Sequence, residues 1–230
     1  MTEMARRLFR QKLDSAGTAV TLGLLAIMTA LPPILAAGPA RWIALLLIAG
    51  GLVSRDVSNG SLQMILARPI SRTDYLLGRF AGALGGYAAF LVFAGALGLV
   101  LGRAFGARPP DPMGLASELA AALLDGALVV ATLLFLSTFL PGYGDVVAYF
   151  ATGIALSTTL SLAQNSGRAG LASAERIAQE NILPAVPWDA LLDTRRIPPE
   201  AVGRWALALV SYFVLAAVVF SRREFAYGHD

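Results

Sequence analysis

One polar loop, residues 54–79, carries the side chains of this sequence that are best suited to specific contacts. It lies between two strongly apolar stretches and contains an early carboxylate, Asp56, followed by several arginines. Charges at such a position are often only the flanks of a membrane helix, but Asp56 could also make a polar contact with a neighbouring loop or a partner. An apolar chain rarely retains so long a polar loop without a use for it. We interpret the loop as the place where a membrane domain meets a cytoplasmic partner.

A short surface helix is predicted inside this loop. Gly60 should break the preceding helix, and Pro69 should end the next one. Between them, Leu62, Ile65 and Leu66 have the i, i+3, i+4 spacing of one apolar helix face. A helix lying across the membrane face would present these side chains to a docked partner. The alternative is an ordinary interfacial loop that re-enters the membrane.

The next membrane helix has a start signal of its own. Ser71 and Asp74 form the pattern Ser-x-x-Asp, which resembles a capping box with aspartate in place of glutamate. Farther along the same helix, glycines recur every four residues. This spacing is typical of close helix packing, and a substrate-lining role is the alternative. The glycines are Gly78, Gly82 and Gly86.

The run SRDVSNGSLQMILARPISRTDYLLGR resembles the loop after the second helix of ABC-2-type permeases, the membrane subunits of many ATP-binding-cassette exporters. Relative to that pattern, Asp56 replaces a glutamate, Ser61 a threonine and Arg79 a lysine. The resemblance is specific over this motif, and over the rest of the chain it concerns the helix pattern. The direct matches are Gly60, Leu62, Pro69, Ser71, Arg72 and Gly78.

The resemblance implies both a function and partners. The loop helix would be a coupling helix that sits in a groove of a separate ATPase subunit, and ATP and Mg would bind to that subunit. Two copies of this chain, or this chain and a related permease, would pair with two ATPase subunits. The coupling residues implied in this way are Asp56, Gly60, Leu62, Ile65, Leu66, Arg68, Pro69 and Arg72.

The sequence lacks the motifs of several enzyme classes. It contains no Gly-x-x-x-x-Gly-Lys-Ser/Thr phosphate loop, no His-Glu-x-x-His and no Gly-x-Ser-x-Gly. Cysteine is absent, and the single histidine is His229. We therefore expect no catalytic residue, metal site or bound cofactor in this chain. The alternatives are an intramembrane enzyme, such as a protease or lipid-modifying transferase, and a membrane anchor that recruits a cytoplasmic ATPase without transporting anything.

Asp125 is a carboxylate inside an apolar run, residues 120–140. A charge at membrane depth is expensive and usually marks a paired or water-facing site. It could pair with Arg41 or Arg103 near the outer face, or it could line a substrate path. It could also lie closer to the membrane surface.

The composition is that of a membrane protein. The chain is 57% hydrophobic and 14% charged, whereas soluble domains carry about 25% charged residues. We expect an all-α, polytopic protein with about six transmembrane helices in a single domain, residues 1–230, without a nucleotide-binding domain. The first two helices should form a hairpin broken near Pro32-Pro33 and Gly38-Pro39. The expected spans are 17–37, 42–54, 76–101, 116–140, 144–163 and 203–220.

The distribution of basic residues predicts the orientation. Residues 3–13 resemble a basic interfacial helix, which the positive-inside rule places in the cytoplasm. With an even number of crossings, the C-terminal tail is also cytoplasmic. The loop 164–202 is then outside, with a short amphipathic helix at 172–183 and an interfacial pair, Trp188 and Trp205.

The remaining expectations concern the lipid partner, the cellular location, the substrate and the oligomeric state. A net charge of +3 in a membrane protein favours anionic lipid over nucleic acid as a partner. We expect the bacterial cytoplasmic membrane as the location. The apolar helices are compatible with lipids, glycans, peptides or drugs as the substrate. The sequence is also compatible with either a homodimer or a heterodimer.

Overall fold

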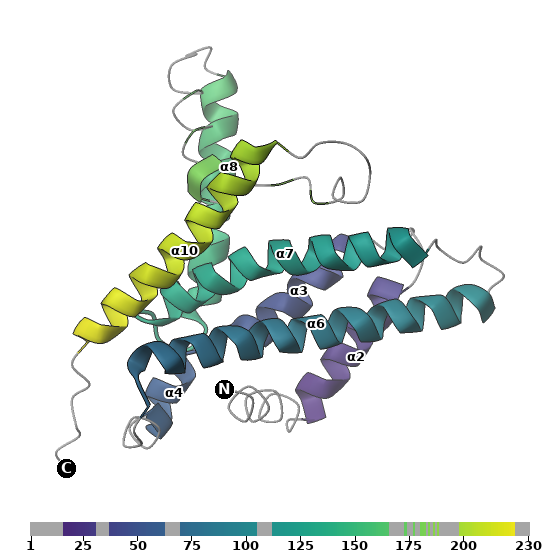
Figure 1. Ribbon diagram of the computed structural model, residues 1–230, viewed down its shortest axis with the longest axis horizontal. Coiled ribbons are helices and arrows are strands. Elements are labelled where there is room, and N and C mark those ends of the chain that lie inside the picture. The colour runs from purple at the N-terminus through teal and green to yellow at the C-terminus, as the bar shows by residue number, and fades with distance from the viewer. Residues whose placement is uncertain are drawn as a thin grey trace.

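The computed structural model describes residues 16–30, 37–62, 70–104, 112–165 and 198–223, together with 173, 177, 180–182, 184, 186 and 188. Regular structure in these residues is helical throughout, as the all-α prediction requires. The helices are α2 (Ala16–Ala30), α3 (Ala37–Ala49), α4 (Ser54–Ser58), α6 (Arg72–Ala104), α7 (Pro112–Ser137), α8 (Gly144–Asn165) and α10 (Pro199–Arg222) (Figure 1). The predicted helix at 3–13 lies outside the described residues.

Three helices are long and apolar enough to cross a membrane: α6, α7 from Met113 onward, and α10. A crossing of ~30 Å needs about 20 residues. With 15 residues in α2 and 13 in α3, neither reaches that length by itself. The 22 residues of α8 would be long enough, but this helix carries several serines and threonines and is not among the three. The six expected spans are therefore all helical in part, and three of them have both the length and the hydropathy of a span.

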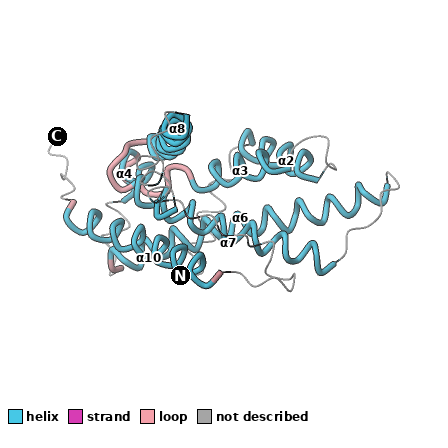
Figure 2. Tube along the Cα trace, turned by 90° about the horizontal axis from the view of Figure 1, so that it is seen from above, coloured by secondary structure: helices cyan, strands magenta, loops and turns pink. Residues whose placement is uncertain are grey.

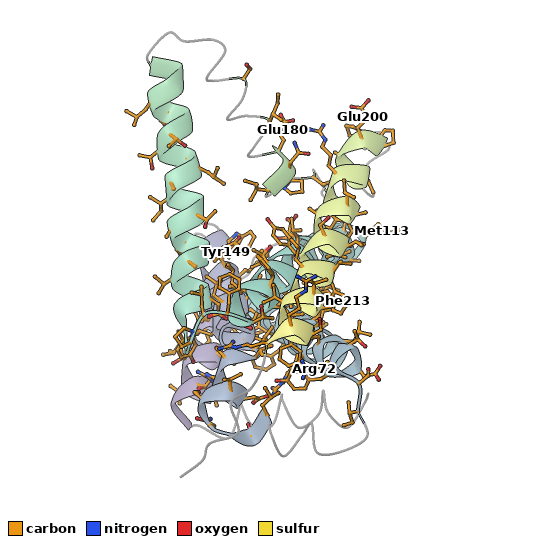
Figure 3. All side chains as sticks on the ribbon, turned by 90° about the vertical axis from the view of Figure 1, so that its left-hand side faces the viewer. Arg72, Met113, Tyr149, Glu180, Glu200 and Phe213 are labelled. Carbon is orange, nitrogen blue, oxygen red and sulfur yellow. The ribbon has the colours of Figure 1, made fainter. Side chains whose placement is uncertain are left out.

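The long helices α6 and α7 lie side by side at the centre of the molecule (Figure 1). On one side, α2 and α3 pack against α6, and on the other α10 crosses α7 and α6 (Figure 2). Alanines at these contacts let the helix backbones approach closely, and Ala26, Ala44 and Ala83 are fully buried. In contrast, α8 extends away from the other helices (Figure 3), and apolar side chains along it, such as Val147 and Ile154, are exposed.

The second expected helix, 42–54, ends earlier than predicted. It stops as α3 at Ala49, and a turn over residues 50–53 separates it from α4. Gly51 in this turn has a φ of +70°, a conformation that side-chain-bearing residues rarely adopt. The expected interruption between the first two helices agrees with the structure, since α2 ends at Ala30 and α3 begins at Ala37. Pro39 lies in the first turn of α3, where its missing N–H has no helical partner to lose. Pro32-Pro33 lies outside the described residues.

Two local predictions for the polar loop are confirmed. The helix before Gly60 ends at Ser58, and Gly60 has a φ of +67°. The predicted cap also forms: the Ser71 hydroxyl accepts the backbone N–H of Asp74 at 3.0 Å and donates to its carboxylate at 2.6 Å. The serine thus fixes the residue at which α6 begins.

The described parts of the 164–202 loop pack against α10. Glu180 forms an ion pair with Arg204, and the Tyr212 hydroxyl donates to the Ile182 carbonyl at 2.8 Å. The two tryptophans assigned to the membrane interface, Trp188 and Trp205, are in contact, which the sequence did not predict: their rings meet edge to face at 5.1 Å between centres. Ile177 and residues 180–182 are helical, within the amphipathic helix expected at 172–183.

The contact between Gly126 of α7 and Tyr87 of α6 predicts a position that is sensitive to substitution. A methyl group at Gly126 would lie 2.6 Å from Cε1 of the buried Tyr87 ring. We expect Gly126→Ala to lower the free energy of unfolding by about 1–3 kcal/mol, because the added methyl group would overlap the ring and the ring or the helix would have to shift. Gly153→Ala in α8 is the matched control, since nothing lies within 4 Å of its added methyl group. Thermal unfolding of both variants in detergent checks this, and an equal melting temperature would contradict it.

Candidate functional site: a buried polar network at one end of the bundle

The buried polar side chains of the described residues gather at one end of the helices, apart from Thr132, which lies five residues before the end of α7. We call this group the basal network. Because an unpaired polar group is costly to bury, each member must have a partner, and these partners connect the 54–79 loop to several helices. The members of the basal network are Ser54, Asp56, Arg79, Ser137, Thr138 and Asp145.

Asp56 is the centre of the basal network. Only 4% of this residue is exposed, and its carboxylate forms an ion pair with Arg79. The Tyr75 hydroxyl donates to the same carboxylate oxygen at 2.6 Å, and Arg79 Nε in turn donates to that hydroxyl at 3.2 Å. Asp56, at the start of the 54–79 loop, is thereby fixed to α6.

The sequence explains how α6 supplies both partners. Tyr75 and Arg79 are four residues apart, so they lie on one face of the helix, one turn from each other. The Tyr75 ring is fully buried and stacks on Phe220 of α10 at 5.6 Å between ring centres. This stacking holds the hydroxyl toward Asp56, and the same contact joins α6 to the end of α10.

Two arginines bind the carboxyl-terminal ends of neighbouring helices. Arg72 donates to the carbonyls of Phe220 and Ser221, at 3.0 and 2.6 Å, in the last turn of α10. Arg223 donates to the carbonyl of Thr138, just after α7. Carbonyls at a helix end have no helical partner and carry partial negative charge, so a guanidinium group is a favourable partner there.

The turn between α3 and α4 docks onto the turn between α7 and α8. The backbone N–H of Gly51 donates to the carboxylate of the buried Asp145 at 2.7 Å. Close by, the backbone N–H of Val53 donates to the Ser137 hydroxyl at 3.1 Å, and the Ser54 hydroxyl donates to the Gly142 carbonyl at 2.5 Å. These bonds connect the loop to α7 and α8.

The predicted coupling residues do not all lie at the surface. Leu62 is 2% exposed and belongs to the hydrophobic core, so its side chain is covered by this chain itself. Asp56 is likewise buried, and its contacts lie within the chain. Arg72 is exposed but holds the end of α10. Gly60 is exposed. The remaining predicted coupling residues, Ile65, Leu66, Arg68 and Pro69, lie outside the described residues.

The glycines of the expected packing motif, Gly78, Gly82 and Gly86, are all buried in α6. They share the buried face of this helix with Tyr75 and Arg79. Without side chains, these glycines leave a narrow buried face on α6, and both α2 and α7 contact this helix.

Asp125 lies far along α7 from the basal network, in a pocket between α3, α6 and α7. Of the two arginines considered as partners, Arg41 lines the same pocket, whereas Arg103 is exposed near the end of α6. Arg41 pairs directly with Glu118, at 2.5 Å between Nη2 and Oε1. Glu118 is a pocket residue that the sequence reasoning missed, although its position seven residues before Asp125 places both on one face of α7.

The described residues contain no group of three or more His, Cys, Asp or Glu side chains that could hold a metal ion. No model of a known protein family matches the sequence, and no curated protein matches it either. The evidence for function is therefore the sequence motif, the apolar helices and the basal network.

Proposed function

We propose that this chain is the membrane-spanning permease subunit of an ATP-binding-cassette exporter. In this proposal six helices cross the bacterial cytoplasmic membrane, and the 54–79 loop transmits movement from a separate ATPase subunit. The three long apolar helices support the membrane location. The motif of the loop supports the permease class.

The observation that carries the proposal is the buried ion pair between Asp56 and Arg79. It joins the start of the 54–79 loop to α6, which supports joint movement of the loop and this helix. Tyr75 and Arg72 extend the connection to α10. A coupling loop requires this property, because a force applied by a docked ATPase must reach the membrane helices.

The roles of the coupling residues follow from their burial. Asp56 and Leu62 act inside the chain: Asp56 binds Tyr75 and Arg79 of α6, and Leu62 is part of the hydrophobic core. Ile65, Leu66 and Arg68 remain the candidates for direct contact with the ATPase, and Arg72 joins the loop to α10. Two copies of this chain, or this chain and a homologous permease, form the transport path.

Copurification with an ATPase subunit and assays of ATP hydrolysis test this proposal. The tagged chain should copurify with an ABC-type ATPase subunit encoded beside it, and the pair should hydrolyse ATP. The chain purified alone should not hydrolyse ATP, because its sequence has no phosphate loop. Hydrolysis by the rigorously purified single chain, or the absence of any complex with the neighbouring ATPase, would contradict the proposal.

The orientation can be tested with single cysteines, since the chain has none. We expect Gly170→Cys to react with a membrane-impermeant maleimide in intact cells, because the 164–202 loop lies outside in this topology. Asn59→Cys, at an exposed position of the cytoplasmic loop, should react only after the membrane is permeabilised. The reverse pattern would show that the orientation is wrong.

A further inference from the structure

A pocket of about 190 Å³ lies between α3, α6 and α7, toward the end of α3 and α7 that is away from the basal network. One water molecule needs only ~15 Å³ of such space, so the pocket can hold several waters or a small molecule. Its inner wall is buried: Leu45 and Tyr87 are 1% and 3% exposed, and both lie next to Gly126. Its rim is more open to the surroundings, since Trp42 is 42% exposed.

One ion pair lies at this rim. Arg41, near the start of α3, and Glu118, in the second turn of α7, pair at 2.5 Å between Nη2 and Oε1, and both line the pocket. Their side chains are 24% and 54% exposed, so the pair belongs to the open part of the pocket. We call it the distal ion pair. It joins two of the three helices that form the pocket.

The other end of α3 is held by buried contacts. Beyond this end, the backbone N–H of Gly51 donates to the buried carboxylate of Asp145 at 2.7 Å. A methyl group at Gly50 would lie 2.8 Å from Cγ2 of Val146, so the chain at the end of α3 lies directly against the start of α8. Arg41 is about 12 Å from this end of α3, at 1.5 Å per residue. The helix is therefore attached at both ends, in two different ways.

The two attachments differ in strength. Breaking a hydrogen bond to a buried carboxylate leaves polar groups without partners in the interior, which is costly. An exposed ion pair usually changes an equilibrium constant by no more than about fivefold, and dissolved salt screens it. The distal ion pair can therefore break while the basal contacts of α3 remain, and hinge movements of this kind occur at the ends of helices.

We propose that the distal ion pair controls access to the pocket. While the pair is formed, it holds α3 against α7 and keeps the rim narrow. When it breaks, the distal part of α3 moves away from α7 about the Gly50-Gly51 turn, and water and small neutral molecules reach the inner wall. This inference concerns the folded chain alone and does not depend on the transport function proposed above, so either can fail while the other holds.

A single cysteine in the pocket can measure the opening, because the chain has none. Ala122 lines the pocket and is half-buried, so Ala122→Cys supplies a thiol whose reaction with N-ethylmaleimide reports access. The protein is labelled in non-ionic detergent, and the reagent is neutral, so the charges of the pocket do not attract it. We expect Glu118→Gln or Arg41→Met, each added to Ala122→Cys, to raise the labelling rate by about fivefold. Ala121→Cys is the alternative probe if Ala122→Cys does not fold.

Two comparisons separate opening from a local effect of charge on the thiol. Glu118→Gln removes a negative charge and Arg41→Met removes a positive one, so they shift the reactivity of a nearby thiol in opposite directions, whereas both should increase access. Raising the NaCl concentration should accelerate labelling of the parent and leave both variants unchanged, because salt screens only the intact pair. Asp125 lines the same pocket, and Glu118→Gln does not alter it, so this variant tests the distal ion pair by itself.

The matched control is the exposed ion pair of Arg204 and Glu180, whose side chains are 38% and 47% exposed. Glu180→Gln, added to Ala122→Cys, weakens that pair and should leave the labelling rate unchanged. Equal rates in the parent and in the Glu118→Gln and Arg41→Met variants would overturn the proposal. Opposite changes in these two variants, an equal increase in Glu180→Gln, or a parent rate that does not respond to salt would overturn it as well.

Discussion

Arg79→Ala should lower the free energy of unfolding by about 3–5 kcal/mol, because it leaves the Asp56 carboxylate charged and buried without its partner. The two side chains are only 9% and 5% exposed, so water cannot replace the lost contact. Asp56→Ala should be similarly costly, since it leaves a buried guanidinium group. Removing both charges together, with Asp56→Ala and Arg79→Met, should recover much of the loss, because no buried charge remains.

Thermal unfolding in detergent and the yield of folded protein from membranes measure this effect. The exposed pair of Arg204 and Glu180, whose side chains are 38% and 47% exposed, is the matched control. Breaking it with Arg204→Ala should cost about 0–1 kcal/mol. If Arg79→Ala and Arg204→Ala unfold at the same temperature, the basal ion pair does not hold the loop to α6.

The second large effect concerns docking of the ATPase. Ile65→Asp with Leu66→Asp should weaken binding of the ATPase subunit by about 100-fold or more, if each side chain contributes ~1.5 kcal/mol or more in the partner groove. Insertion and folding of the permease should not change. Leu62→Asp should have the opposite pattern: Leu62 is buried in the core, so this change should reduce folded yield first.

Charge alone must be separated from the loss of apolar contact. Ser58→Asp with Asn59→Asp adds the same two charges to the same loop at exposed positions, and it should leave ATPase binding nearly intact. The measurement is the dissociation constant of the purified ATPase for each permease variant. Wild-type affinity in the Ile65 and Leu66 variant, with normal insertion, would show that the loop helix is not the coupling element.

Local signals in the sequence predicted the structure best where a single residue type controls the backbone. Gly60 predicted a helix break and Ser71 predicted the start of α6, since a positive φ and a side-chain cap depend on the residue itself. The break at Gly50-Gly51 was missed because a long apolar run hides a short turn. The interruption expected near Pro32-Pro33 and Gly38-Pro39 agrees with the end of α2 at Ala30 and the start of α3 at Ala37, because a proline is tolerated in the first turn of a helix but not in its interior.

The candidate site could be predicted only in part, because its contacts join residues that are far apart in the sequence. The motif drew attention to Asp56, but not to its connection with Arg79, which depends on how the loop folds back onto α6. Asp145 and Arg223 were missed as well, since their partners are backbone groups of other turns. The spacing of Leu62 placed it on the apolar face of a surface helix. Spacing alone does not distinguish an apolar face that contacts a partner from one that packs into the core of the same chain.

Because the basal network holds one end of α6, a tilt of this helix about the network would displace its other end much more than the network itself. This helix has 33 residues, and its far end at Ala104 lies about 38 Å beyond Arg79 at 1.5 Å per residue. A tilt of about 10° around Arg79 would therefore move that far end by about 7 Å, while Tyr75, one turn from Arg79, would move by about 1 Å. A small displacement of the loop is amplified mechanically along the helix, and pairs of spin labels on introduced cysteines at the two ends would measure the ratio.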